Sequence, residues 1–151
     1  MSNPLPAPEK AHMELRCRVD PSLLGLLRDF VCGVARHLRF SEQEVAEIEI
    51  SVDEACANAM EHAYQQPGDS PDHDVQVELY LSPDKLVIRI SDTGAGRPDF
   101  NHPMDMESYL DINREKFRGL GLVLMRKFMD EVQIFAQPNH GTVVEMTKRK
   151  H

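Results

Sequence analysis

Residues 53–64, DEACANAMEHAY, combine small apolar residues with carboxylates, an amide and an imidazole, and contain no lysine or arginine. Glu54 and Asn58 are four residues apart, so on a helix they lie one turn apart on the same face. A glutamate there can accept a proton from a hydroxyl group or a water molecule. An asparagine oxygen is a suitable ligand for Mg²⁺ whose other ligands are phosphates and water. The stretch therefore fits either a solvated helix face or the wall of a reactive site.

Asp92 follows an apolar strand pattern and precedes two glycines at alternate positions, Gly94 and Gly96. Glycines allow the backbone to lie flat against a ligand, and a carboxylate at a strand end can accept a hydrogen bond from an exocyclic amine. An ordinary Asp-x-Gly turn is the alternative. Asp-Thr-Gly-Ala is also a signature of aspartic proteases, in which two such aspartates share a proton. That interpretation needs an all-β surrounding, which the helical segments before Asp92 contradict.

Gly119 and Gly121 stand at the start of a helical pattern. A glycine-rich helix N-terminus offers free N–H groups and a positive dipole end to phosphate. The segment matches neither the P-loop pattern nor the GxGxxG of dinucleotide-binding folds. Glycines that only turn the chain before a core helix are the alternative. Gly141-Thr142 enters the last predicted strand and carries little information by itself.

Hydrophobic periodicity predicts the elements that must position these groups. Asp20-Pro21 predicts a helix start, and Ser41 with Glu44 fits a capping box. The order is βααββ, a long loop and then αββ, which predicts an α+β two-layer sandwich with helices on one face of a mixed, mostly antiparallel sheet. Residues 1–10 are expected to be a flexible tail, and 11–151 a single domain. Helices are expected over 21–39, 41–64 and 119–129, and strands over 13–19, 75–81, 86–90, 132–136 and 142–147.

The chain has 151 residues and a formal net charge of -8. An acidic chain argues against binding to a nucleic-acid backbone as its main task. No apolar run reaches the roughly 20 residues of a membrane-spanning helix, and the N-terminus lacks the features of a signal peptide, so a cytoplasmic protein is expected. No lysine or arginine occurs between Arg39 and Lys85. This predicts an acidic half of the surface, with an ordinary solvated face as the alternative.

Four motifs occur in one order along the chain, and together they carry a resemblance that none carries alone. The chain resembles the ATPase superfamily shared by gyrase, histidine kinases and MutL, whose fold is the Bergerat fold. Within it, the chain is most similar to the RsbW-like anti-sigma factor serine-protein kinases, over about residues 11–148. The motifs are Glu54-x-x-x-Asn58, Asp92-x-Gly94-x-Gly96, Gly119-Leu120-Gly121-Leu122 and Gly141-Thr142.

The resemblance implies a role for each matched position. Glu54 would be the catalytic base, and Asn58 would hold the Mg²⁺ that bridges the phosphates of ATP. Asp92 would bind the adenine amino group, with Gly96 and Thr142 beside the ring, and the second glycine motif would cradle the phosphates under a lid of about 97–117. The cofactor-binding set for ATP or ADP is therefore Asn58, Asp92, Gly94, Gly96, Gly119, Leu120, Gly121, Leu122 and Thr142.

Two departures from the family pattern concern the lid. Arg97 replaces the commoner small or apolar residue after the second glycine. The basic residue expected to reach the γ-phosphate has no unique match, because Arg114, Lys116 and Arg118 compete; Arg118 is favoured as the second catalytic residue. Phosphoryl transfer depends on positioning and electrostatic stabilisation, so these departures bear on the rate of transfer more than on nucleotide binding.

The function implied by the resemblance is an ATP-dependent serine/threonine-protein kinase. It would phosphorylate a STAS-type anti-sigma factor antagonist with Mg-ATP and sequester a sigma factor, working as a homodimer. The alternative is a nucleotide-binding sequestering protein without significant kinase activity. The other polar residues of the opening stretch, Asp53, Glu61 and His62, are expected to have only local structural roles.

Overall fold

The computed structural model describes residues 11–64, 74–92, 120–136 and 142–151. The predicted order of elements is confirmed in these residues. The predictions for Gly94, Gly96, Arg118, Gly119 and the lid lie outside them. The elements are β1 (Ala11–Arg18), η1 (Pro21–Leu23), α1 (Leu24–His37), α2 (Glu42–Tyr64), β2 (Asp74–Leu81), β3 (Lys85–Asp92), α5 (Leu120–Phe128), β4 (Glu131–Ala136) and β5 (Thr142–Arg149).

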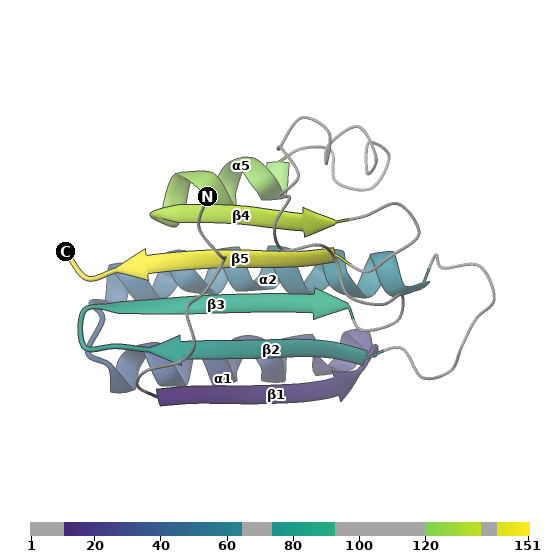
Figure 1. The fold of residues 1–151 in the computed structure, drawn as a ribbon, viewed down its shortest axis with the longest axis horizontal. Helices are drawn as coiled ribbons and strands as arrows, with labels where there is room; N and C mark the ends of the chain where they lie inside the picture. The colour runs from purple at the N-terminus through teal and green to yellow at the C-terminus, as the bar shows by residue number, and fades with distance from the viewer. Residues whose placement is uncertain (1–10, 65–73, 93–119, 137–141) are drawn as a thin grey trace.

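One five-stranded sheet, in the order β1-β2-β3-β5-β4, forms the first layer. Helices α1 and α2 lie behind it in Figure 1, which confirms the two-layer sandwich. Every neighbouring pair of described strands is antiparallel, so the sheet is not mixed in this part of the chain. The reason is the position of β5. It lies between β3 and β4 and separates two strands that run in the same direction.

The core lies between the sheet and α2. The apolar residues of α2 that face the sheet are almost fully buried, and burying one valine, leucine or isoleucine side chain contributes about 1.5–3 kcal/mol. Because these residues recur at helical spacing, their burial also fixes the rotation of α2 about its axis. The stripe comprises Val45, Ile48, Val52, Ala55 and Ala59, each at most 8% exposed, and opposite it lie Val77, Leu79, Ile88 and Ile90, each at most 1% exposed.

The helix starts follow the predicted capping signals, with one difference in length. Ser41 N donates to Glu44 Oε1 at 2.8 Å, and Glu44 N donates to Ser41 Oγ at 3.1 Å, which is a capping box. Asp20 Oδ1 accepts from Ser22 N at 2.9 Å. That cap opens a short 3-10 turn, however, so the predicted helix 21–39 is an α-helix only over Leu24–His37. The helix cannot continue through Arg39, whose φ is 67°.

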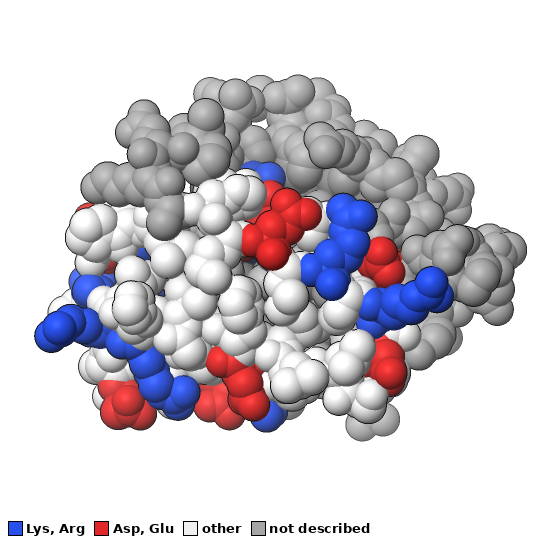
Figure 2. Space-filling model, turned by 90° about the horizontal axis from the view of Figure 1, so that it is seen from below, with Lys and Arg blue, Asp and Glu red and all other residues white. Residues whose placement is uncertain are grey.

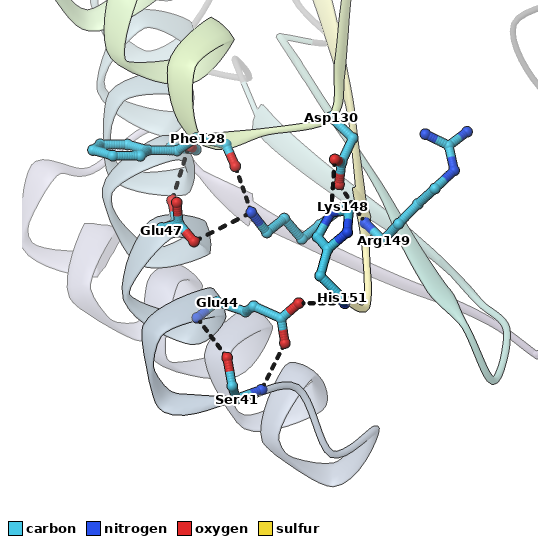
Figure 3. A network of polar contacts seen from close by, with 9 residues as sticks. Ser41, Glu44, Glu47, Phe128, Asp130, Lys148, Arg149 and His151 are labelled. Atoms are coloured by element: carbon cyan, nitrogen blue, oxygen red, sulfur yellow. Dashed lines mark hydrogen bonds and ion pairs between the residues drawn. The ribbon is translucent and has the colours of Figure 1, made fainter.

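A network of polar contacts ties α2, α5 and β5 together (Figure 3). Lys148 Nζ donates to Phe128 O at the end of α5 at 2.6 Å and pairs with Glu47 Oε1 of α2 at 3.4 Å. A cation there also interacts favourably with the dipole of α5. His151 N donates to Glu44 Oε2 at 2.9 Å. Burial alone would raise the pKa of Glu44, but the hydrogen bonds from Ser41 and His151 outweigh it and lower that pKa.

The predicted acidic half of the surface is interrupted by arginines of α1. Arg28 Nη1 lies 3.4 Å from Asp53 Oδ2, and its Nε lies 3.9 Å from Glu49 Oε1. On the surface seen in Figure 2, basic and acidic side chains are interspersed. These pairs favour the ordinary solvated face and give Asp53 the structural role expected of it. Among the described residues, no helix combines the length and apolarity needed to cross a membrane.

Acid is expected to weaken the fold partly through Glu44 and Asp130. At both carboxyls burial acts to raise the pKa, but hydrogen bonds outweigh it and lower the pKa below its ordinary value of 4.5 or 3.8. The folded state therefore binds these protons less readily than the unfolded state. The stabilisation is complete above the ordinary values and is lost as the pH falls through the folded-state values. Urea unfolding between about pH 7 and about pH 3 should show a smaller loss of stability for Glu44→Gln than for the wild type.

Glu42→Gln is the matched control, because the Glu42 side chain is 85% exposed in the same turn of α2. Its loss of stability on acidification should equal that of the wild type. The same loss in Glu44→Gln and in the wild type would contradict the role assigned to Glu44.

Candidate active site

Four elements bring the predicted site residues to one end of the sheet. β3 ends at Asp92 and β5 begins at Thr142. The register pairs Ser91 with Val143, so these two strand ends are neighbours. The C-terminal part of α2 and the start of α5 reach the same end, on the right in Figure 1. The fold thus brings described residues of all four motifs to one end of the sheet.

The side of α2 that carries Ser51, Glu54 and Asn58 is not a solvated face. Burial of the apolar stripe turns the neighbouring positions partly inward, and Asn58 is only 8% exposed while Glu54 is partly buried. Ser51, on the same side, is 0% exposed and donates from Oγ to Glu47 O at 2.9 Å.

Asn58 carries an unsatisfied group. Its Nδ2 atom is buried and has no hydrogen-bond partner in the structure as described. Leaving such a group unpaired costs about 1–3 kcal/mol, so its position calls for a partner such as a ligand, an ion or a water molecule. An asparagine amide presents an oxygen that can ligate a hard cation and an NH₂ group that can donate to an anion. The residue therefore fits a site for a magnesium–phosphate group.

Glu54 lies against the first turn of α5. Gly121 is buried there, and a Cβ atom added to it would collide with the Glu54 carboxylate, 3.1 Å from Cδ and closer still to Oε2. Leu122, the next residue, is 1% exposed. Its side chain is part of the core, so only its backbone remains available to a ligand. The structure thus brings the Glu54-x-x-x-Asn58 motif into contact with the glycine motif at the start of α5. The linear sequence did not reveal this contact.

Asp92 ends a central strand and is 2% exposed. A buried carboxylate at a strand end can recognise an amine by hydrogen bonding, which agrees with the expected role. Leu120 and Thr142 are placed at the starts of α5 and β5. Gly94, Gly96, Arg118 and Gly119 lie outside the described residues, so their roles stay predictions.

Two other kinds of chemistry, nucleophilic catalysis by a cysteine and proteolysis by paired aspartates, do not fit this end of the sheet. Burial and then the negative charge of Asp53 raise the pKa of Cys56 to about 12. The thiolate is the reactive form of cysteine, so this thiol is not a nucleophile at neutral pH. The two-layer arrangement of helices on a sheet also contradicts the aspartic protease alternative, which requires β-structure around its aspartates.

Comparison with known proteins identifies relatives over most of the chain. The family profile described as "Histidine kinase-like ATPase domain" matches residues 17–148. The chain is 35% identical over 140 residues to the "Serine-protein kinase RsbW" of Bacillus pumilus, covering 90% of this chain and 84% of that protein. It is 30% identical over 121 residues to the "Anti-sigma F factor" of Thermoanaerobacter sp. strain X514, covering 80% and 81%.

The fold also matches a solved structure. The crystal structure of the RsbU and RsbW domains of a Mycobacterium tuberculosis protein aligns with a TM-score of 0.63 and 15% identity. The alignment covers 93% of this chain and 32% of that longer chain. At this identity the match concerns the fold alone, and it agrees with the sheet order and helix layer described above.

Replacing Asn58 by leucine is expected to leave the fold as stable as the wild type, or more stable. Leucine has the same branching as asparagine and removes the unpaired buried amide, and replacing such a group by an apolar one is nearly neutral or stabilising. The free energy of unfolding from urea denaturation should stay within about 1 kcal/mol of the wild type or rise.

Ser51→Ala is the control on the same helix, because the Ser51 hydroxyl is buried and has a partner. Its loss should lower the free energy of unfolding by about 1 kcal/mol. If Asn58→Leu destabilised the protein more than Ser51→Ala, Asn58 would have a structural role and not the functional one argued here.

Proposed function

This chain belongs to the histidine kinase-like ATPase family, and we propose that it works as an RsbW-type serine-protein kinase that uses ATP to phosphorylate an anti-sigma factor antagonist. The observation that carries the proposal is the contact of Glu54 with the first turn of α5, one turn of α2 from the buried and unpaired amide nitrogen of Asn58. The similarity to RsbW over most of both chains supports the same conclusion.

Nucleotide binding uses residues of all four motifs. The N–H groups of the first turn of α5, Leu120–Leu122, would bind the phosphates, because the positive end of the helix dipole favours an anion, and the family motif assigns the same role to Gly119. Asp92 accepts a hydrogen bond from the adenine amino group, with Gly94, Gly96 and Thr142 around the ring. Asn58 offers its amide oxygen to Mg²⁺. When bound, the ion neutralises charge on the phosphates.

The reaction itself needs few protein groups. Glu54 accepts the proton of the substrate serine or threonine hydroxyl while that oxygen forms a bond to the γ-phosphorus of ATP. The bond from the γ-phosphorus to the bridging oxygen breaks, and ADP carries away its electron pair. Arg118 from the lid stabilises the charge on the transferred group, with Arg114 and Lys116 as the alternative donors. The chain's main contribution is to hold these groups in place.

The biological output in this proposal is a partner switch. The substrate is a STAS-domain antagonist, and its unphosphorylated form competes with a sigma factor for the kinase. Phosphorylation adds about 1.5 to 2 negative charges to the antagonist at neutral pH, which disrupts its contact with the kinase. The kinase is then free to hold the sigma factor. In the same proposal the kinase acts as a homodimer in the cytoplasm, where transcription takes place.

Glu54→Gln is expected to lower phosphate transfer by about 100-fold or more, because general base catalysis contributes factors of this size. The measurement is the intact mass of a STAS-domain antagonist from the same organism after incubation with the kinase and Mg-ATP. Glu49→Gln, which removes another partly buried carboxylate from α2, is the control and should retain wild-type transfer.

Transfer that survived Glu54→Gln undiminished would show that Glu54 is not the base. A wild-type protein that bound ATP and phosphorylated none of the STAS-domain proteins of its organism would instead be a nucleotide-binding sequestering protein. The two results are therefore distinguishable in one set of assays.

Asp92→Asn is expected to weaken ATP binding by about 10-fold to 100-fold, because a hydrogen bond to a charged group contributes about 1.5–3 kcal/mol. Isothermal titration calorimetry with Mg-ATP measures the change. Asp84→Asn, in the exposed turn between β2 and β3, is the control and should bind like the wild type. Equal affinities for all three proteins would contradict the assignment of the adenine site.

A further inference from the structure

Gly121 and Glu54 occupy adjoining space between α5 and α2. A Cβ atom built on Gly121 would meet Oε2 of Glu54 first and would lie 3.1 Å from Cδ and 3.4 Å from Cγ. Non-bonded carbon atoms are normally about 3.5–4.0 Å apart. The carboxylate of Glu54 therefore lies where any side chain larger than that of glycine would have to be.

The turn that contains Gly121 cannot easily move away from Glu54. Leu122 and Met125 are 1% and 0% exposed, so core packing fixes the rotation of α5. At the other end of α5, Lys148 binds Phe128 O and also pairs with Glu47 of α2. The helix is thus held to α2 by its buried face and at its C-terminal end, and Gly121 faces Glu54 as a consequence.

Within the described residues, no hydrogen bond or ion pair joins the Glu54 carboxylate to another side chain or to the backbone. Its neighbour Asp53 differs, because its Oδ2 atom pairs with Arg28 Nη1 at 3.4 Å, although its Oδ1 atom is buried without a partner among the described residues. An unpaired carboxylate suits a residue that must accept a proton. It also means that the orientation of Glu54 depends on what it packs against, and the structure shows Gly121 in that position.

We infer that Gly121 is a positioning residue for the base, an inference that rests on the proposed function because it takes Glu54 as the proton acceptor. The first turn of α5 is the wall that directs the Glu54 carboxylate, and the missing side chain at Gly121 is what allows the carboxylate to lie there. The same turn presents its N–H groups to the phosphates. One rigid turn therefore sets the position of the base relative to the transferred phosphoryl group.

The physical requirement behind this arrangement is a short distance. A base works only within about 2.6–3.2 Å of the group whose proton it takes. A misplacement of about 1 Å can lower a rate about 100-fold. A methyl group on residue 121 would displace the carboxylate by such an amount, yet it would leave the backbone N–H groups of α5 unchanged.

The test is Gly121→Ala, assayed for phosphate transfer to a STAS-domain antagonist. We expect kcat to fall about 100-fold, while KM for ATP and the dissociation constant for Mg-ADP stay within about threefold of the wild type. Gly33→Ala is the matched control, since a Cβ there would have no atom within 4 Å, and its kinetics should be those of the wild type. A wild-type kcat in Gly121→Ala would overturn the inference.

A second measurement needs no catalysis. The ¹³Cδ resonance of Glu54 in the free protein, identified by its loss in Glu54→Gln, should shift in Gly121→Ala and stay unchanged in Gly33→Ala. An unchanged resonance would overturn the inference whatever the kinetics. Because this readout uses neither nucleotide nor substrate, it tests the contact even if the wild type transferred no phosphate, a result that would contradict the proposed function alone.

The third measurement asks whether a shorter base relieves the collision. Glu54→Asp removes one methylene, so in the Gly121→Ala background the carboxylate carbon takes about the place of Cγ, 3.4 Å from the added methyl group, and the collision is reduced. We expect kcat of the double variant to lie within about threefold of Glu54→Asp alone, because the two changes act on one contact. If kcat of the double variant instead fell by the product of the two single losses, the methyl group would act at a place other than Glu54, and the inference would be overturned.

Discussion

The structure depends on the burial of one face of α2 against the sheet. Val45, Ile48, Val52, Ala55 and Ala59 are at most 8% exposed, and their common face can be buried in only one rotation of the helix. That rotation brings the neighbouring polar positions to the border between the core and the surface. Glu54 and Asn58 are consequently held on a rigid element, and the apolar core determines where they point.

Helix α5 adds the second half of the site, and contacts at both of its ends fix it to α2. At its start, Gly121 packs against Glu54 without a side chain between them. At its end, the Lys148 ammonium joins Phe128 O to Glu47. The two contacts differ in kind, one steric and one charged, but each crosses from α5 to α2. Together they fix the first turn of α5, the proposed phosphate site, relative to Glu54, the proposed base.

A rigid arrangement of α2 and α5 suits a reaction in which positioning contributes most of the rate acceleration. The proposed transfer needs no nucleophile on the protein, and Cys56, two residues after Glu54, is kept inert by a pKa of about 12. Leaving the buried amide nitrogen of Asn58 unpaired lowers stability, and in the proposed function this is the cost of keeping a polar group ready for a ligand.

The sequence by itself determined the order of the elements, the capping box at Ser41 and the family, because these follow from local periodicity, local hydrogen bonding and the order of four short motifs. It also indicated Glu54, Asn58 and Asp92. It did not determine that α1 begins only at Leu24, that β5 separates β3 from β4, or that arginines of α1 neutralise acids of α2. Only the tertiary structure decided that Asn58 is buried and unpaired and that Gly121 faces Glu54. Those facts arise from packing between segments far apart in the chain, and no local pattern encodes the angle at which two helices meet.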